Sequence, residues 1–352
     1  MGGAASSPPA TEVRGLARTA ACRQTAAMAN VFVTRSLPGN AVAQLAAAGH
    51  SVTVWPGELP PPPAALREQL REAEGALTMV TDRCDAALFD ACPGLRIVAN
   101  MAVGYDNIDT KAAAERGVWA SNTPGVLAET TADLAFALLL GVARQVVASD
   151  RDTRAGGWKA WSPTAFLGPD VYGATLGIIG LGEIGTAMAR RAKGFSMRLL
   201  HTSRTAKPAA EAELGIERVA LDELLRRSDF VSIHTPLTPE TRHLINKDTL
   251  ALMKPTAMLV NTTRGAVVDQ DALVEALRAG RLAGAALDVT DPEPLPLSHA
   301  LYTFPNVVIT PHIGSAGAAT RARMAEMAAA NIIAVLAGGR PVNAINEVAR
   351  AR

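Results

Sequence analysis

The sequence predicts an α/β protein whose two domains are each built on a doubly wound parallel sheet. Its 352 residues suffice for two domains of ordinary size. From Asn30 onwards, short apolar runs alternate with helical patterns, which is typical of βαβ units and a parallel sheet. After a polar loop at 156–170, a second series of the same kind begins at Thr175. Each series predicts one sheet.

The first series contains the elements expected for the first sheet and its helices. A helix at 40–48 ends at Gly49, and a proline-rich stretch at 60–63 predicts a stiff loop. Residues 130–147 predict one long helix that is apolar on nearly every face, which indicates burial or a subunit interface. The expected strands are 31–34, 51–55, 76–81, 97–101 and 118–120.

The second series predicts a larger sheet followed by a last helix. A helix at 186–193 follows the first strand, and the helix at 316–338 is ended by Gly338 and Gly339. The expected strands lie near 176–180, 198–202, 230–234, 257–261, 283–288 and 307–310.

Composition and charge exclude several classes of partner. Hydrophobic residues make up 49% of the chain, and the formal net charge is +1 with no run of Lys or Arg, so we expect no nucleic-acid or membrane partner. The longest apolar stretch, 134–143, is too short to span a bilayer. The three cysteines have no metal-ligand or paired spacing. We therefore expect no metal and a reducing, cytoplasmic compartment.

The first 29 residues differ from the rest and are left out of the fold. They are rich in Ala, Ser, Thr and Pro, and they contain three arginines but a single acid, Glu12. This composition is typical of an organelle transit peptide. The alternative is a disordered or untranslated leader, because Met28 immediately precedes the first predicted strand.

A glycine-rich loop predicts a dinucleotide site of the Rossmann type. The strand from Thr175 leads into G-x-G-x-x-G, and a helical pattern follows it. Such glycines permit a tight turn, close approach of backbone to a pyrophosphate and close helix packing, while the helix N-terminus binds the phosphates. The loop comprises Gly180, Leu181, Gly182, Glu183, Ile184 and Gly185.

The end of the following strand indicates which dinucleotide binds. NAD sites usually place an acid about twenty residues past the glycines, and none occurs here. Ser203, Arg204 and Thr205 stand there instead, with Lys207 behind them, which suits a 2′-phosphate. We therefore expect NADPH (NADP) to be preferred, with NADH possible. The alternative for Arg204 is a solvated loop residue.

Three polar residues follow predicted strands and form a candidate catalytic set: Arg264, Glu293 and His312. An arginine can hold a carboxylate with two hydrogen bonds, and a histidine beside a carboxylate can donate a proton to a carbonyl oxygen. Reducing a ketone needs that proton together with a hydride. His234 also ends a strand and competes as proton donor, although Thr235 and Pro236 beside it favour a cofactor-lining turn.

From about Asn30 to its end, the chain resembles the D-2-hydroxyacid dehydrogenases, most closely their glyoxylate/hydroxypyruvate reductase branch. The resemblance is carried by Met101-Ala-Val-Gly104-Tyr-Asp106-Asn-Ile-Asp109, Asn122-Thr-Pro124-Gly, Glu129-Thr-Thr-Ala-Asp133, Gly156-Gly-Trp158, the glycine-rich loop, Asn261-Thr-Thr-Arg264-Gly, Leu287-Asp288-Val-Thr, Asp291-Pro-Glu293-Pro-Leu295-Pro and Pro311-His312-Ile-Gly314-Ser315.

The resemblance implies a function and a site. Arg264, Glu293 and His312 would be catalytic in reducing a short 2-keto acid, glyoxylate or hydroxypyruvate, to the D-2-hydroxy acid. Val103, Gly104, Arg264 and Ser315 would bind this substrate. Pro236, Thr262, Asp288, His312 and Gly314 would line the cofactor site, with Asp288 near the nicotinamide amide. Glu183 departs from the arginine common in relatives, and an acid there would lie near the pyrophosphate.

The resemblance also implies the domain layout and the assembly. A flavodoxin-like, discontinuous substrate domain would comprise 30–125 and 318–352, and a Rossmann domain 126–317. The family is typically dimeric, and Trp161 would then extend into the partner's cleft or pack at the interface.

Other functions share this scaffold. Phosphite and phosphoglycerate-type dehydrogenases are alternatives within enzymes, whereas formate dehydrogenases carry Gln in place of Glu293. Outside enzymes, dinucleotide-sensing corepressors share the fold, but they usually have a long polar C-terminal tail that this chain lacks.

Overall fold

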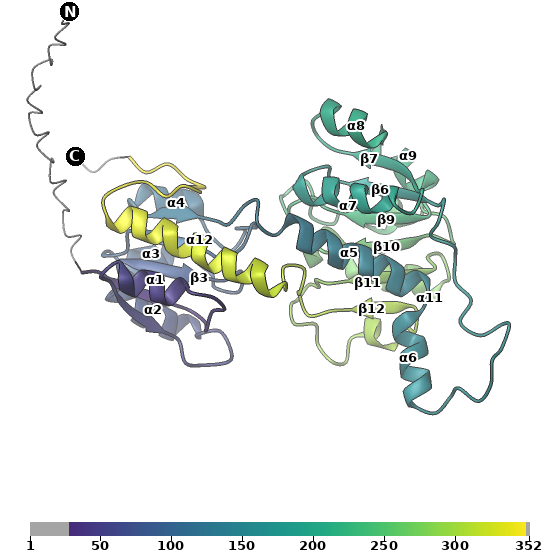
Figure 1. Ribbon diagram of the computed structural model, residues 1–352, viewed down its shortest axis with the longest axis horizontal. Coiled ribbons are helices and arrows are strands. Elements are labelled where there is room, and N and C mark those ends of the chain that lie inside the picture. The colour runs from purple at the N-terminus through teal and green to yellow at the C-terminus, as the bar shows by residue number, and fades with distance from the viewer. Residues whose placement is uncertain (1–27, 350–352) are drawn as a thin grey trace, which may run out of the picture.

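The computed structural model of the protein describes residues 28–349, which form two parallel sheets with helices on both faces of each (Figure 1). The predicted fold class is confirmed. Of the predicted leader, all residues before Met28 lie outside the described part of the chain.

The first sheet has five parallel strands in the order β2-β1-β3-β4-β5. They are β1 (Asn30–Val33), β2 (Ser51–Val54), β3 (Gly75–Thr78), β4 (Ile97–Asn100) and β5 (Trp119–Ser121). One face is covered by α2 (Pro63–Arg71), α3 (Ala86–Ala91) and α4 (Thr110–Glu115), and the other by α1 (Ala41–Ala47) and α12 (Ala318–Leu336).

The C-terminal helix α12 packs on the first sheet, although it follows the second in sequence (Figure 1). Ala325 and Ile332 are buried with Val31 and Val33 of β1. Arg96 donates to the carbonyl of Val335 at 2.9 Å. The chain therefore returns to its starting layer after completing the second sheet.

The second sheet has seven parallel strands in the order β12-β11-β10-β9-β6-β7-β8. They are β6 (Thr175–Ile179), β7 (Arg198–Thr202), β8 (Glu217–Arg218), β9 (Phe230–Ile233), β10 (Met258–Asn261), β11 (Gly284–Leu287) and β12 (Val307–Ile309). The helices are α5 (Ala128–Ala143), α6 (Val146–Arg154), α7 (Glu183–Lys193), α8 (Pro208–Leu214), α9 (Leu221–Arg227), α10 (Lys247–Leu250) and α11 (Gln270–Arg278).

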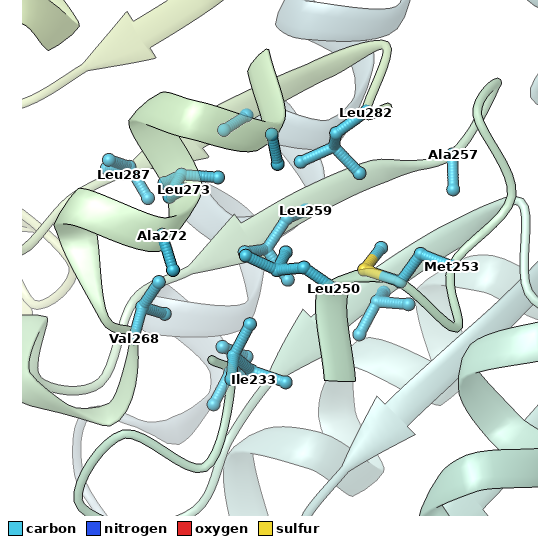
Figure 2. Packing of buried hydrophobic residues seen from close by; sticks show 14 of the residues in the cluster. Ile233, Leu250, Met253, Ala257, Leu259, Val268, Ala272, Leu273, Leu282 and Leu287 are labelled. Carbon is cyan, nitrogen blue, oxygen red and sulfur yellow. The ribbon is translucent and has the colours of Figure 1, made fainter. Parts of the chain in front are cut away.

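Apolar side chains fill both faces of the second sheet. Figure 2 shows one face, where Ile233 of β9 and Leu259 of β10 meet Leu250 of α10 and Leu273 of α11. Helices α5 and α7 cover the opposite face. Because parallel strands are buried on both faces, they are apolar along their whole length, and this is why short apolar runs predicted them.

The expectation of one helix over 130–147 is wrong. Helix α5 ends at Ala143, and α6 starts at Val146 with its axis bent by 62°. Gln145 between them has a left-handed φ of 50°, and its side chain donates to the carbonyl of Leu167 at 2.7 Å. That partner is distant in sequence, so the local apolar pattern gave no sign of the break. Within residues 28–349 no single helix has the length and hydropathy to cross a membrane, and the bent α5–α6 pair meets that criterion only as a pair.

Candidate active site

The order of the second sheet locates a ligand crevice. Strand β6 lies between β9 and β7, so the chain runs outward from it in both directions. Ligands of such sheets bind beyond the carboxyl ends of the strands at this switch point. The glycine-rich loop follows β6, and Arg264 and His312 follow β10 and β12 at the same edge.

The glycine-rich loop has the shape of a phosphate cradle. Gly180 has a φ of 96°, and a Cβ there would lie 2.6 Å from the carbonyl oxygen of His234. A Cβ on Gly185 would lie 2.1 Å from the carbonyl oxygen of Gly180. At Gly182, by contrast, a Cβ would meet no described atom within 4 Å, because this residue faces open space at the N-terminus of α7. Two glycines are thus required by packing, and the third leaves room for a ligand.

Two buried polar atoms beside the cradle have no hydrogen-bond partner within the described chain. They are Nδ1 of His234 and Oγ1 of Thr262. Buried polar groups are nearly always satisfied, so unpaired ones directly after the carboxyl ends of β9 and β10 suit a polar ligand. Together with the cradle, they show that the residues present fit a dinucleotide.

His234 is unsuited to the role of proton donor. Its Nε2 lies 2.8 Å from Oγ of Ser232, and burial lowers its pKa to about 4. The imidazole is therefore neutral at physiological pH, which fits a cofactor-lining residue better than an acid.

The loop after β7 carries several cations. Ser203 is half-buried, Arg204 and Thr205 are exposed, and the Ser203 hydroxyl donates to the carbonyl of Thr205 at 2.8 Å. Arg218 of β8 donates to the carbonyl of Ser203 at 3.1 Å. Sequence reasoning missed Arg218, because only the β7–β8 pairing brings it beside this loop.

Glu211 of α8, the helix that follows this loop, faces inward. It accepts from the backbone N–H of Lys207 at 2.8 Å and lies 3.2 Å from Nε2 of His201. The Lys207 N–H is the main cause that holds the pKa of Glu211 below its usual value. Burial lowers the pKa of His201.

The guanidinium of Arg264 is held on three sides. Its Nε and Nη2 each lie 2.9 Å from Oδ1 of Asp106, and Nη1 donates to the carbonyl of Thr263 at 2.8 Å. A Cβ on Gly104 would lie 2.0 Å from Nη2 and 2.8 Å from Cζ, so the guanidinium rests directly against this glycine. The structure therefore brings together Gly104 and Arg264, which both belong to the predicted substrate site.

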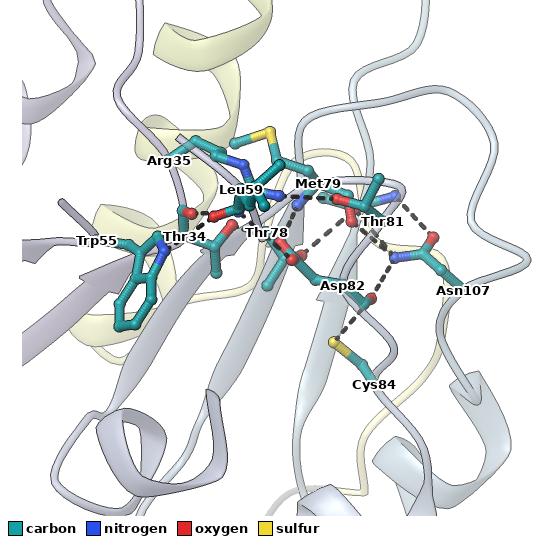
Figure 3. Close-up of polar contacts among 11 residues, drawn as sticks. Thr34, Arg35, Trp55, Leu59, Thr78, Met79, Thr81, Asp82, Cys84 and Asn107 are labelled. Carbon is teal, nitrogen blue, oxygen red and sulfur yellow. Dashed lines mark hydrogen bonds and ion pairs between the residues drawn. The ribbon is translucent and has the colours of Figure 1, made fainter. Parts of the chain in front are cut away.

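Side-chain amides hold the loop that carries Val103 and Gly104. Asn122 donates to the carbonyl of Val103 at 2.9 Å, and Asn100 donates to that of Gly104 at 3.0 Å. Asn107 in turn donates to the carbonyls of Met79 and Asp82, at 3.1 and 2.9 Å (Figure 3). The loop is thereby attached to the carboxyl ends of β3 and β4.

A buried carboxylate completes this support. Asp82 accepts hydrogen bonds from the hydroxyl of Thr34 and from the backbone N–H of Met79, and Arg35 lies 3.9 Å from its other oxygen (Figure 3). Burial raises the pKa of Asp82.

His312 and Glu293, two members of the predicted catalytic set, lie in contact with each other. Nδ1 of His312 lies 2.6 Å from Oε1 of Glu293, and both side chains are partly exposed. His312 has a left-handed φ of 53°. Its backbone N–H donates to the carbonyl of Asp288 at 2.8 Å. Ser315 lies just beyond on the same loop and is half-buried.

Asp288 holds the histidine loop with both carboxylate oxygens. Oδ1 accepts from Oγ1 of Thr310 at 2.7 Å and from the N–H of Ile313 at 2.8 Å, while Oδ2 accepts from the N–H of Gly314 at 2.8 Å. The side chain is 1% exposed. This bracing role adds to the expected place near the nicotinamide.

Three further predicted residues lie at the surface. Pro236 is exposed after β9. Trp161 is 82% exposed on the segment between α6 and β6, where Trp158, Leu167 and Tyr172 are exposed as well. Glu183 is exposed in the first turn of α7.

A cavity of about 830 Å³ lies at the opposite end of β6 and β7. Thr175 and Arg198, the first residues of these strands, line it together with Arg227 and Lys254. The last two are paired with Glu217 and Asp229. It is therefore separate from the site described above.

Comparison with known proteins identifies the family. Residues 136–314 match the model for the D-isomer specific 2-hydroxyacid dehydrogenase NAD-binding domain. The chain is 51% identical over 318 residues to a glyoxylate reductase of Korarchaeum cryptofilum, which covers 90% of this chain and 96% of that one.

Solved structures agree with this assignment. One, from Thermus thermophilus, has a TM-score of 0.85 and 52% identity, and the match covers 90% of this chain and 99% of that chain. The NADPH-dependent glyoxylate/hydroxypyruvate reductase of Sinorhizobium meliloti, in complex with NADP and malonate, has a TM-score of 0.81 and 32% identity, over 92% of this chain and 99% of that chain. The chain therefore belongs to the D-isomer specific 2-hydroxyacid dehydrogenase family, in its glyoxylate reductase branch, and is a dehydrogenase that uses a nicotinamide dinucleotide.

Proposed function

We propose that the protein reduces a short 2-keto acid, glyoxylate or hydroxypyruvate, to the D-2-hydroxy acid with NADPH. The observation that carries this proposal is the juxtaposition of Arg264 with Gly104 and of His312 with Glu293, at the sheet edge that holds the phosphate cradle. Related proteins named glyoxylate reductase at about half identity support the same substrate class.

Each residue has a distinct task in the proposed reaction. When bound, the dinucleotide would supply a hydride to the carbonyl carbon. Arg264 and the backbone N–H groups of the Val103–Gly104 loop bind the substrate carboxylate. His312 donates a proton from Nε2 to the carbonyl oxygen, because its Nδ1 faces Glu293. Glu293 orients the imidazole through its contact with Nδ1.

The cations around Ser203 support the preference for NADPH. Arg204 and Lys207 follow Ser203, and Arg218 bonds to its carbonyl. Guanidinium groups suit a phosphate through paired hydrogen bonds, whereas NAD sites present an acid to the ribose hydroxyls. Glu211, on the helix after this loop, is engaged with His201 and with the backbone N–H of Lys207.

We propose that residues 30–125 and 318–352 form the substrate-binding domain and 126–317 the nucleotide domain, in a homodimer. The exposed aromatic residues on the segment from Trp158 to Tyr172 support the dimer, because large exposed apolar patches mark contact surfaces. A monomeric sedimentation profile at micromolar concentration would contradict it.

Initial rates with four pairs of reactants test the function. Glyoxylate and hydroxypyruvate are each combined with NADPH and NADH, and loss of absorbance at the reduced-nicotinamide band is followed. We expect turnover with both acids and faster turnover with NADPH. Turnover confined to NADH would refute the cofactor assignment alone. Turnover in no combination, alongside tight dinucleotide binding, would refute the reaction and favour phosphite oxidation or a binding role.

A further inference from the structure

The side chain of Asp106 bridges the two sheets at the substrate site. Asp106 lies between β4 and α4 of the first sheet, whereas Arg264 follows β10 of the second. One oxygen, Oδ1, contacts both Nε and Nη2 of Arg264 at 2.9 Å. The Arg264 side chain is 20% exposed and that of Asp106 40% exposed, so the pair is partly open to solvent.

The contacts of Arg264 determine which of its N–H groups remain for a ligand. A guanidinium has five N–H donors in a fixed plane. Asp106 takes the edge formed by Nε and Nη2, and the carbonyl of Thr263 takes one donor of Nη1. The remaining donors, one on Nη1 and one on Nη2, lie side by side at the tip of the group. No described residue bonds to them.

We propose that Asp106 is a positioning residue that holds the guanidinium of Arg264 so that its tip, and not its side, receives the carboxylate of the substrate. This inference rests on the proposed function. Gly104 supports the same orientation from below, because the guanidinium lies against its Cα. Asn100 holds Gly104 by donating a hydrogen bond to its carbonyl. Two residues that follow β4 of the first sheet, Gly104 and Asp106, therefore position the guanidinium of Arg264.

The charge of Asp106 has a second effect. The negative charge of Asp106 offsets the positive charge of Arg264, and this weakens the attraction of the substrate carboxylate. Asp106 therefore benefits substrate binding through the orientation of Arg264. A side chain that keeps the acceptor oxygen but loses the charge should therefore preserve function. This separates positioning from bulk electrostatics.

The test compares Asp106→Ala with Asp106→Asn, using the full chain with NADPH. Removing a charge-assisted hydrogen bond should raise the KM for glyoxylate in Asp106→Ala about ten- to a hundredfold. Asp106→Asn, whose amide oxygen still accepts from Nε, should keep KM within about threefold of wild type. The Kd for NADPH and the thermal midpoint should stay unchanged in both variants.

Asp90→Ala provides a matched control. Asp90 forms a comparable arginine pair on the same half of the molecule, with Arg116 Nε at 2.7 Å, but away from the crevice. Its KM should equal that of wild type.

The outcomes separate this inference from the proposed function. A wild-type KM in Asp106→Ala, or equal loss in Asp106→Ala and Asp106→Asn, would overturn the inference. If the wild type reduces no glyoxylate, the proposed function fails. In that case the positioning role of Asp106 is still tested by titrating oxamate, a carboxylate that cannot be reduced, into the NADPH complex. Weaker oxamate binding by Asp106→Ala alone supports this role. Equal binding, or no binding, in all variants refutes it.

Discussion

Replacing Asp288 by Asn should displace His312, the proposed proton donor, without unfolding the protein. The carboxylate of Asp288 accepts from Thr310 Oγ1, Ile313 N and Gly314 N, and it is almost fully buried. An amide has a single acceptor oxygen. Whichever way the amide of Asn is turned, the N–H of Ile313 or that of Gly314 then faces another donor.

The size of the effect follows from these contacts. A hydrogen bond to a charged group contributes about 1.5–3 kcal/mol, and a buried N–H left without a partner costs about 1–3 kcal/mol. His312 also holds a left-handed backbone conformation that costs about 1–3 kcal/mol for a non-glycine residue, and Asp288 helps to offset it. If the lost energy appears as displacement of His312, kcat falls about ten- to a hundredfold, since 1.36 kcal/mol is tenfold in rate.

Steady-state kinetics and amide hydrogen exchange measure this effect. We expect kcat to fall, the Kd for NADPH to change by less than about threefold, and exchange to quicken at Ile313 and Gly314. A kcat within twofold of wild type would refute the proposed bracing of the histidine loop. A large loss of NADPH affinity at constant kcat would show instead that Asp288 acts through the nicotinamide.

Three further changes test other parts of the site. Gly104→Ala should lose most of kcat/KM at unchanged NADPH affinity, because its Cβ would lie 2.0 Å from Nη2 of Arg264; wild-type kinetics would contradict the close contact. Arg204→Asp should shift the ratio of kcat/KM toward NADH, because a carboxylate repels a 2′-phosphate, and an unchanged ratio would mean that the phosphate is bound elsewhere. His234→Gln should make the protein less sensitive to acid. Burial lowers the pKa of His234 from the ordinary 6.5 to about 4, so between these values the unfolded chain binds a proton that the folded chain does not. The free energy of unfolding therefore falls as the pH drops below 6.5. Between pH 7.5 and 5 this contributes about 2 kcal/mol, so urea unfolding should show a smaller pH dependence in the variant, and an equal dependence would contradict the assignment.

Sequence patterns were sufficient for the elements that depend on local order. Strands β6, β9 and β10 are apolar because they are buried on both faces, and the glycines at 180, 182 and 185 have spacing that a phosphate cradle requires. The pairing of His312 with Glu293 was also predictable, because both follow strands of one sheet.

These local patterns did not predict contacts between segments that are distant in sequence. The break at Gln145 depends on the carbonyl of Leu167, and Arg218 reaches Ser203 only through the pairing of β7 with β8. Asp106 and Arg264 are 158 residues apart. Nothing in the local sequence of Asp106 indicates an ion pair across two sheets, so the motif around it was recognised without a role for this residue.

The variant His312→Ala tests whether His312 supplies the proton while other residues bind the dinucleotide. NADPH binding is measured by fluorescence titration, and single-turnover oxidation of NADPH by glyoxylate is followed in the same preparation. General acid catalysis contributes about 10²- to 10⁴-fold, so we expect a rate loss of that size with an unchanged Kd for NADPH. A rate within tenfold of wild type, or parallel loss of binding and turnover, would contradict it.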